Sequence, residues 1–278
     1  MSNRTPTGAA MVAGVVGAPI RHSLSPLLHN AWIAAAGLDA IYAPFAPPED
    51  GFGDLVQGLR RGVIRGLNVT APFKTEALAL GDEVDPAAEA AGAANLLLFQ
   101  TDGRIIAHNT DGIGLLYAFA RQAPDWRPDA GAIAIIGAGG AARGAAAALK
   151  AAGARDVRIV NRTRERAESL AAILDVAGFG FDDKADALAG VSTLINTASG
   201  GFDLVGWFAQ GAQVAMDMVY SPLKTQFLAA AEAAGLEIVD GLDMLIGQAR
   251  PSFEAFYGQP PPEIDVRAVA LAELARRK

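Results

Sequence analysis

The chain has 278 residues, of which 51% are hydrophobic, with a formal net charge of -7 and no cysteine. The length corresponds to about two domains at roughly 150 residues each. Without cysteine, disulfide frameworks, thiolate nucleophiles, zinc–thiolate sites and iron–sulfur clusters are all excluded. The acidic balance and the 7% aromatic content argue against nucleic acid as a partner, because such a partner needs basic surface and stacking side chains.

No apolar run reaches the roughly 18 residues that a membrane-spanning helix needs. Gly8–Ile20 is similar to the apolar core of a signal peptide, but it lacks a clustered basic start. Arg21 and His22 follow it in place of a small-residue cleavage site. We therefore interpret this segment as a buried strand, and we expect a cytoplasmic protein with no membrane partner.

Short apolar runs alternate with longer segments rich in alanine and leucine, which is typical of α/β proteins. A helix is predicted to begin at Ser25-Pro26, with serine as its cap and proline in its first turn, and to end at Gly37. Thr101-Asp102-Gly103 predicts a hairpin turn. The other elements predicted in this half are the strands Met11–Gly17, Ile41–Phe45, Gly66–Val69, Ala94–Phe99 and Arg104–Ala107, and a helix from Pro72.

The second half begins with a predicted helix from Asp111 to Gln122. Pro124–Gly131 is rich in Pro, Asp and Gly and is interpreted as a linker. A right-handed βαβ unit follows, because a strand, a helix and a second strand are predicted in succession. Its parts are the strand Ala132–Ile136, a loop and helix together spanning Gly137–Ala152, and the strand Val157–Val160. The later elements are the strands Thr193–Asn196, Gln213–Met216 and Glu237–Val239, and the helices Leu242–Tyr257 and Val266–Lys278.

A glycine-rich loop follows the strand Ala132–Ile136. It reads Gly137-Ala138-Gly139-Gly140-Ala141-Ala142 and matches G-x-G-x-x-A, which allows a tight turn and a close approach of the backbone to a ligand. The helix after it would direct its free N–H groups and positive dipole end at a pyrophosphate. An ordinary strand–helix turn is the alternative, but the flanking strand and helix favour a nucleotide site.

The end of the next strand indicates which dinucleotide is bound. NAD-binding domains place an acidic residue about 20 positions on, where it binds the ribose 2′-hydroxyl. Asn161-Arg162-Thr163 contains no carboxylate, and Arg164 and Arg166 follow. Guanidinium groups bind a 2′-phosphate, whereas a carboxylate repels it. We therefore predict NADP, and a solvated basic helix face is the alternative.

Polar clusters also fall at predicted strand ends in the first half, where α/β proteins bind small ligands. Ser23 and Ser25 lie just before a helix start, so both hydroxyls can face an anion, although a cap explains Ser25 alone. Asn68 and Thr70 share one face of a strand. The three histidines do not have metal-ligand spacing, so no metal site is predicted.

Lys74 falls in the first turn of the helix predicted from Pro72. A cation there opposes the helix dipole, which favours the neutral amine and suits a proton-transferring lysine. An exposed lysine that extends into solvent is the alternative. Asn95 and Asp111 form the last cluster, in which Asp111 either caps the following helix or acts in catalysis.

Taken together, these segments resemble the shikimate dehydrogenase family over nearly the whole chain. Any one motif is modest evidence, but the set in the expected order is strong evidence. The motifs are Gly17–Pro26, Asn68-Val69-Thr70 with Pro72-Phe73-Lys74, Asn109-Thr110-Asp111-Gly112, Gly137–Arg143, Asn161-Arg162-Thr163, Asp217-Met218-Val219-Tyr220 and Asp240–Ala249.

The resemblance implies reversible reduction of 3-dehydroshikimate to shikimate by NADPH, a step toward chorismate and the aromatic amino acids. It assigns Lys74 and Asp111 as the catalytic pair. The implied substrate-binding residues are Ser23, Ser25 and Tyr220 at the carboxylate, and Asn68, Thr70, Asn95 and Gln248 at or supporting the ring hydroxyls. The implied cofactor-binding residues are Gly137, Ala138, Gly139, Gly140, Ala141, Asn161, Arg162, Thr163, Arg166, Met218 and Gly241.

The same resemblance implies an α/β substrate domain of residues 1–110, to which residues 242–278 return. Residues 111–241 would form a Rossmann-like, doubly wound NADP-binding domain, with a cleft between the two. We expect a monomer or a homodimer whose partner is a small-molecule substrate.

Two positions depart from the family pattern. Leu96 stands where the family has Thr, which leaves open a shifted preference, for example toward quinate. Thr197-Ala198 replaces the family's Ala-Thr, which can alter cofactor affinity. The alternatives are therefore a quinate- or aminoshikimate-type dehydrogenase and, more distantly, a non-catalytic nucleotide-binding protein. The presence of both Lys74 and Asp111 disfavours the latter.

Overall fold

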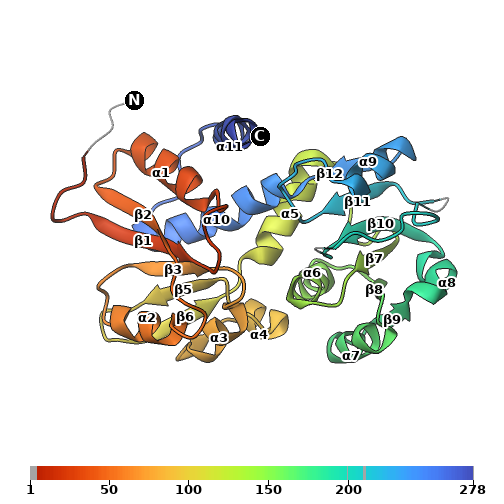
Figure 1. The fold of residues 1–278 in the computed structure, drawn as a ribbon, viewed down its shortest axis with the longest axis horizontal. Coiled ribbons are helices and arrows are strands. Elements are labelled where there is room, and N and C mark those ends of the chain that lie inside the picture. Colours follow the sequence, from red (N-terminus) through yellow and green to blue (C-terminus); the bar gives the residue numbers. More distant parts are fainter. Residues whose placement is uncertain (1–4, 199, 209–210, 278) are drawn as a thin grey trace. The chain divides into compact units, whose positions relative to one another are not determined.

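The computed structural model describes residues 5–198, 200–208 and 211–277. Within these residues the chain forms two compact units (Figure 1). Unit 1 comprises the chain up to Thr110 together with the chain from Gln248 onward, and unit 2 comprises Asp111–Gly247. Helix α10 (Gly241–Tyr257) crosses the boundary between the two units, which lies between Gly247 and Gln248. The sequence resemblance implies that the chain returns to the first domain at residue 242, and in the structure this return lies within the single helix α10.

Unit 1 contains a mixed sheet with the strand order β2-β1-β3-β5-β6-β4. β1 pairs in parallel with β2 and β3, whereas β5 runs antiparallel to β3 and β6. As a result, the carboxyl ends of β1 and β3 and the amino end of β5 lie at one edge of the sheet. The strands are β1 (Met11–Val16), β2 (Ala40–Phe45), β3 (Gly66–Val69), β4 (Glu83–Val84), β5 (Leu96–Phe99) and β6 (Ile105–His108).

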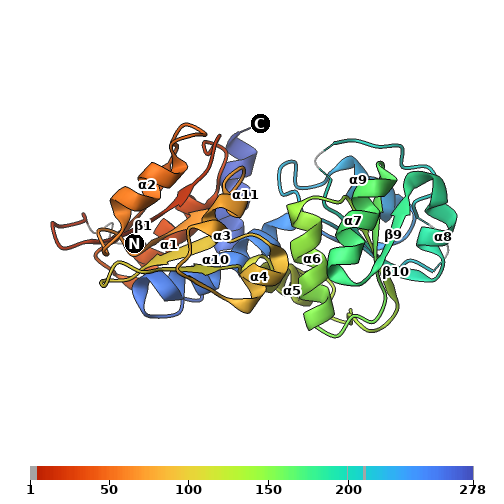
Figure 2. The same ribbon diagram turned by 90° about the horizontal axis from the view of Figure 1, so that it is seen from below.

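Helices cover both faces of this sheet (Figures 1 and 2). α2 (Phe52–Leu59), α3 (Lys74–Ala79) and α4 (Pro86–Ala91) lie on one face. The core beneath them includes Phe52 and Phe73, whose rings stack with centroids 4.6 Å apart. α1 (Ser25–Ala36), α10 and α11 (Val266–Arg276) lie on the other face, over an aromatic cluster that includes Trp32 and Phe253.

Unit 2 contains a parallel sheet with the order β12-β11-β10-β7-β8-β9. The chain builds outward from β7 to β9 and then returns to place β10 on the other side of β7. This is the doubly wound order of the Rossmann fold, and it confirms the predicted fold class. The strands are β7 (Ala132–Ile136), β8 (Val157–Asn161), β9 (Ala177–Gly180), β10 (Val191–Asn196), β11 (Val214–Asp217) and β12 (Glu237–Val239).

The helices of unit 2 divide between the two faces of its sheet. α5 (Asp111–Gln122), α6 (Gly140–Ala151) and α7 (Arg164–Leu174) pack on one face. α8 (Lys184–Leu188), α9 (Gln226–Ala233) and the 3₁₀ turn Phe181–Asp183 pack on the other. The alanine-rich composition lets helices approach closely: a Cβ on Gly112 of α5 would lie 2.6 Å from the Cβ of Ala148 on α6.

The predicted strands and helices in both halves agree with the structure to within two residues, with two local exceptions in unit 1. Ser25 is the first residue of α1 and not its cap; Leu24 occupies the cap position, and the Ser25 N–H donates to the Ser23 hydroxyl at 3.2 Å. The next helix begins at Lys74 and not at Pro72, because residues 71–73 form a turn in which the Phe73 N–H donates to the Thr70 carbonyl.

The interpretation of Pro124–Gly131 as a linker is also wrong, since this segment is a packed loop within unit 2. Trp126 stacks on Phe119 of α5, with ring centroids 4.0 Å apart. Its indole N–H donates to the hydroxyl of Thr193 on β10 at 2.9 Å. Packing of one partly buried aromatic ring in an otherwise polar segment therefore fixes the position of this loop.

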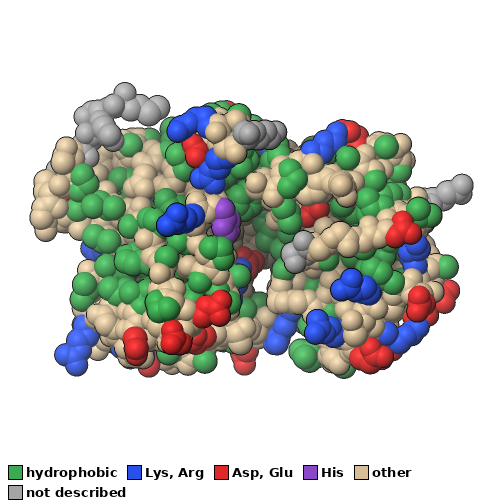
Figure 3. Space-filling model, in the orientation of Figure 1, with side chains coloured by type: hydrophobic (Ala, Val, Ile, Leu, Met, Phe, Trp, Pro, Cys, Tyr) green, Lys and Arg blue, Asp and Glu red, His purple; other side chains and the backbone are tan. Residues whose placement is uncertain are grey.

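On the face of the molecule shown in Figure 3, Lys and Arg side chains are dispersed among acidic and apolar ones. Across the ranges that the structure describes, no helix combines the length and apolar character needed to cross a membrane. In the same ranges, no group of three or more His, Asp or Glu side chains is arranged to hold a metal ion.

Candidate active site

The first candidate site lies at the carboxyl edge of the unit 2 sheet, where β7 and β10 are neighbours. In a doubly wound sheet a ligand binds at this edge, in the crevice where the strand order reverses. Thr197, directly after β10, contacts the end of β7 closely: its N–H and its hydroxyl both donate to the Ile136 carbonyl, at 2.9 and 2.8 Å. The two strand ends are thereby joined beneath the glycine loop.

The glycine loop requires its first glycine for two reasons. Gly137 has φ +116°, a conformation that residues with a side chain rarely adopt. A Cβ there would also lie 2.4 Å from the Thr197 hydroxyl oxygen. Gly139 is the cap residue of α6 and has no side chain to occupy the helix N-terminus. The first N–H groups of α6 and its positive dipole end therefore suit an anionic ligand.

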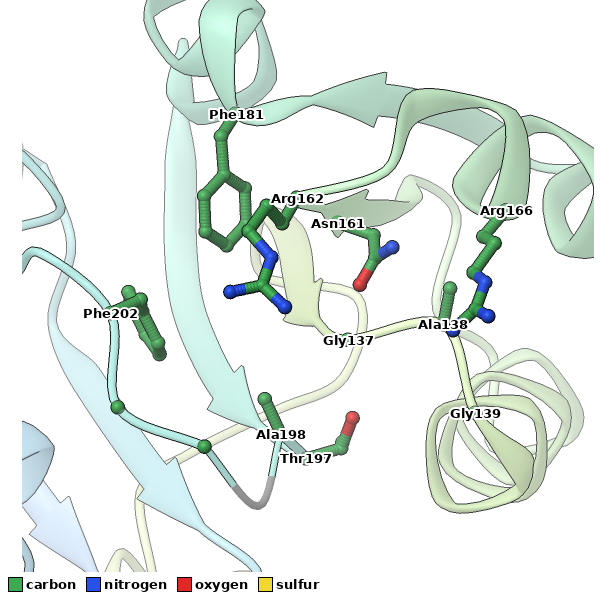
Figure 4. A pocket seen from close by; sticks show the side chains of 12 residues that line it. Gly137, Ala138, Gly139, Asn161, Arg162, Arg166, Phe181, Thr197, Ala198 and Phe202 are labelled. Carbon is green, nitrogen blue, oxygen red and sulfur yellow. The ribbon is translucent and has the colours of Figure 1, made fainter.

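A cavity of about 290 Å³ lies against this loop (Figure 4). Its lining residues are Gly137, Ala138, Gly139, Asn161, Arg162, Arg166, Phe181, Thr197, Ala198, Gly200, Gly201 and Phe202. The first six were predicted as cofactor residues from the sequence. Of the remaining predicted ones, Gly140 and Ala141 begin α6 and Thr163 is the cap residue of α7, and none of these three lines the cavity.

The arginines after β8 differ in what they contact. The Arg162 guanidinium points into the cavity between Phe181 and Asn161, and Arg166 lies beside the glycine loop (Figure 4). Arg164 instead forms ion pairs with acidic side chains of unit 2, and its hydrogen bond to Asp183, together with that carboxylate's charge, raises the pKa of Arg164. Among the described residues, the cavity is thus lined by two guanidinium groups and no carboxylate, which suits a phosphate.

A buried carboxylate shapes the loop after β11. Asp217 is 1% exposed and accepts three hydrogen bonds. The donors are the Asn196 amide at 3.0 Å, the Thr225 hydroxyl at 2.7 Å and the Val219 N–H at 3.0 Å. The carboxylate therefore ties the end of β10, the loop after β11 and the start of α9 together.

This loop contains two residues that the family resemblance assigns to the site. The Met218 N–H donates to the Asn196 carbonyl at 3.1 Å. Gly241, at the start of α10, packs on the same segment, because a Cβ there would lie 2.5 Å from the Met218 carbonyl oxygen. Tyr220 follows in the same loop and is half-buried. Met218, Tyr220 and Gly241 all lie in unit 2, and none of the three is among the residues that line the cavity.

Unit 1 contains a second polar site, centred on Asn95. This side chain is 3% exposed. Its amide nitrogen donates to the Thr110 hydroxyl at 3.0 Å and to the Gln248 side-chain carbonyl at 3.1 Å. Its amide oxygen accepts the Thr110 N–H at 2.8 Å, and the Thr110 hydroxyl also bonds the Gln248 main-chain carbonyl at 3.0 Å. The start of β5, the end of the β6–α5 loop and helix α10 are thereby joined.

Asn68, on β3, extends this network. Its amide nitrogen donates to the Ser252 hydroxyl at 2.8 Å and to the Asn95 main-chain carbonyl at 3.3 Å. Its amide oxygen accepts the Tyr42 hydroxyl at 2.7 Å. The structure therefore brings Asn68, Asn95 and Gln248 into one network and adds Tyr42 and Ser252, which the sequence did not single out.

The remaining substrate-side residues of unit 1 follow the ends of β1 and β3 at the same edge; they are Ser23, Ser25, Thr70 and Lys74. Gly17 packs on Thr70, since a Cβ on Gly17 would lie 2.5 Å from the Thr70 methyl group. The Lys74 carbonyl accepts the N–H of Ala94, the residue before Asn95, at 2.9 Å. Lys74 is the first residue of α3 in unit 1, and Asp111 is the first residue of α5 in unit 2.

Known proteins match this chain along most of its length. The family model described as shikimate dehydrogenase substrate binding domain matches residues 15–97, and the model described as shikimate/quinate 5-dehydrogenase matches residues 121–200. A curated relative from Caulobacter vibrioides, named shikimate dehydrogenase (NADP(+)), is 54% identical over 276 residues, covering 95% of this chain and 96% of the relative. The chain belongs to the shikimate dehydrogenase family.

Solved structures of this family share the fold. Shikimate 5-dehydrogenase from Thermus thermophilus, in complex with NADP(H) and shikimate, aligns with a TM-score of 0.82 at 33% identity, over 96% of this chain and 99% of that chain. Quinate dehydrogenase from Corynebacterium glutamicum, in complex with NAD, aligns with a TM-score of 0.83 at 26% identity, over 95% and 99%. The shikimate dehydrogenase fold thus serves proteins named for different substrates, and the side chains must select between them.

Replacing Asp217 with alanine is expected to lower the free energy of unfolding by about 3 kcal/mol, because three donors lose their shared acceptor. Urea denaturation measures this loss. Asp203→Ala is the matched control: Asp203 is exposed and accepts only the Val205 N–H, at 3.0 Å, among the hydrogen bonds of the described residues. The control is expected to cost under about 1 kcal/mol. Equal losses in the two variants would contradict the role given to Asp217.

Proposed function

We propose that this chain catalyses the reversible, NADP-dependent reduction of 3-dehydroshikimate to shikimate. Family membership supports the reaction, since the relative that is 54% identical is named for it. The observation that carries the choice of cofactor is the cavity at the glycine loop, where Arg162 and Arg166 line the wall after β8 and none of the lining residues that the structure describes is acidic. A ribose 2′-phosphate would be bound there, and a free 2′-hydroxyl would lack its usual acidic partner.

The cofactor is proposed to lie along the carboxyl edge of the unit 2 sheet. The backbone of Gly137–Gly139 and the N-terminus of α6 would hold the pyrophosphate. Arg162 and Arg166, with Asn161 and Thr163, would hold the adenosine end. Gly140 and Ala141 supply N–H groups from the first turn of α6, and Met218 and Gly241 would flank the nicotinamide end.

The substrate is proposed to bind to unit 1. Ser23 and Ser25, with Tyr220 of unit 2, would bind its carboxylate, and Asn68, Thr70 and Gln248 its ring hydroxyls. Asn95 has a supporting role in this scheme, because both hydrogens of its amide are used by Thr110 and Gln248. A site in which each polar group has a partner discriminates strongly against analogues that lack a hydroxyl.

The chemistry divides between the cofactor and two side chains. When bound, the nicotinamide supplies the hydride that the ketone carbon accepts. Lys74 is proposed to stabilise the developing alkoxide with its ammonium group and to donate the proton that neutralises it. Asp111 would orient the lysine for this transfer. In the direction of shikimate oxidation, the same lysine accepts the hydroxyl proton.

The cellular setting and assembly belong to the same proposal. We infer a cytoplasmic enzyme, monomeric or homodimeric, whose partner is the small-molecule substrate and not nucleic acid. The relatives named for shikimate and the formal net charge of -7 support this view.

Quinate is the second candidate substrate, because Leu96 replaces the family's Thr on the strand that pairs with Asn68. Leu96 is 3% exposed, so its side chain belongs to the core. The arginine-lined cavity, in turn, disfavours the NAD-using type of quinate enzyme.

A two-by-two comparison of shikimate and quinate with NADP+ and NAD+ tests the proposal. The purified chain is expected to give its highest kcat/KM with shikimate and NADP+, measured by the absorbance of the reduced nicotinamide. A higher kcat/KM with quinate would favour the second candidate. An absence of turnover with every pair, in protein that still binds NADPH, would contradict an enzymatic role.

Cofactor preference has its own test at the arginines. Arg162→Ala is expected to raise the KM for NADP+ roughly thirtyfold, because a charge-assisted hydrogen bond contributes about 2 kcal/mol. The KM for NAD+ should change by less than about threefold, since no 2′-phosphate is present. Arg164→Ala, which removes a guanidinium already paired with Asp183, is the matched control and should leave the preference unchanged. An unaltered preference in Arg162→Ala would refute the phosphate assignment.

A further inference from the structure

Tyr42 is a buried residue that has no part in the proposed chemistry. It lies on β2 and is 2% exposed. Its hydroxyl donates to the amide oxygen of Asn68 on β3 at 2.7 Å, across the one intervening strand, β1. Burial raises the pKa of Tyr42 well above its usual value, so the hydroxyl keeps its proton and remains a donor.

The Tyr42 ring is held in one orientation by neighbouring aromatic side chains. It stacks on His29 with ring centroids 3.9 Å apart and an interplanar angle of 7°. His29 is completely buried, and burial lowers its pKa to about 3, so this is a stack of two neutral rings. The Trp32 ring packs edge-on against the His29 ring, with ring centroids 5.6 Å apart. The tyrosine hydroxyl is therefore presented to Asn68 from a rigid support.

The partners of Asn68 determine which way its amide faces. The Asn95 main-chain carbonyl can only accept, so the Asn68 nitrogen must face it. The second N–H is used by the Ser252 hydroxyl, which itself donates to the Gln248 carbonyl at 3.3 Å. Both hydrogens of the Asn68 amide are thus committed. The amide oxygen accepts from Tyr42 and has room for one further donor.

We propose that Tyr42 is a positioning residue that acts through Asn68. Its hydroxyl holds the Asn68 amide oxygen in place so that this oxygen accepts a hydrogen bond from a ring hydroxyl of the substrate. Ser252 performs the matching function for the amide nitrogen. This inference rests on the proposed function, because the hydroxyl belongs to shikimate. It also assigns the direction of this hydrogen bond. Because the Asn68 amide oxygen accepts, the substrate group that it contacts must be a donor.

A double-mutant cycle on the full-length protein tests the inference. Tyr42→Phe keeps the stacked ring and removes only the donor, and it is expected to lower kcat/KM for shikimate roughly tenfold. The KM for NADP+ should be unchanged. In an Asn68→Ala background, Tyr42→Phe should alter kcat/KM by less than about twofold, because the amide oxygen that the tyrosine hydroxyl contacts is gone. If Asn68→Ala folds poorly, Asn68→Ser serves as the background, with the same expected result.

Tyr257→Phe is the matched control, since it removes a hydroxyl from the same aromatic cluster. That hydroxyl donates to the Ile41 carbonyl at 3.4 Å, and no hydrogen bond found among the described residues links it to Asn68. The control should alter kcat/KM by less than about twofold in either background. An equal cost of Tyr42→Phe with and without the Asn68 side chain would overturn the inference while leaving the proposed function intact. A wild-type protein that does not turn over shikimate would overturn both.

Discussion

The contact between Thr197 and the end of β7 determines the shape of the proposed cofactor site. Thr197 bonds the Ile136 carbonyl through both its N–H and its hydroxyl, and its oxygen leaves no space for a side chain on Gly137. The glycine loop must therefore turn sharply and present its backbone at the sheet edge. Because the sheet is parallel, the chain after β8 and β9 reaches the same edge, and Arg162 and Phe181 arrive there with it.

The mixed sheet of unit 1 also brings residues from separate stretches of the chain together at one edge. β1 and β3 end at the edge where the antiparallel β5 begins, so residues from three separate stretches of the chain meet there. The network around Asn95 then adds α10, whose Gln248 lies 153 positions further along the chain. Pairing the amide groups of Asn68 and Asn95 in this way leaves few orientations open to these side chains, which is the condition for selecting among small polyhydroxylated substrates.

Much of the fold could be predicted from the sequence, because buried parallel strands are short apolar runs and β7 is followed by a glycine motif of fixed spacing. The motif residues Asn161, Arg162 and Arg166 were found for the same reason. Phe181 was not, because β9 before it reads Ala-Gly-Phe-Gly, a weak strand signal. Predicting Phe181 would have required knowing that the chain after β9 reaches the same sheet edge as the chains after β7 and β8.

Other residues were out of reach for lack of any local signal. Tyr42 and Ser252 both contact Asn68 but lie far apart in the sequence, so no spacing relates them. The segment around Trp126 has the composition of a linker, and only its stacking on Phe119 shows otherwise. Ser25 has the residue type of a helix cap, yet the Ser23 hydroxyl accepts the Ser25 N–H. Serine side chains form either kind of local hydrogen bond at similar free energy, so the residue type alone does not predict which one forms.

We propose that unit 2 binds the cofactor by itself, while Lys74, in unit 1, transfers the proton. The most direct test is to measure NADPH affinity by calorimetry and shikimate turnover in one variant, Lys74→Ala. The expected result is an affinity within about twofold of the wild type, with kcat lowered by roughly a hundredfold or more. A loss of NADPH affinity in parallel with turnover, or turnover that survives the substitution, would contradict the claim.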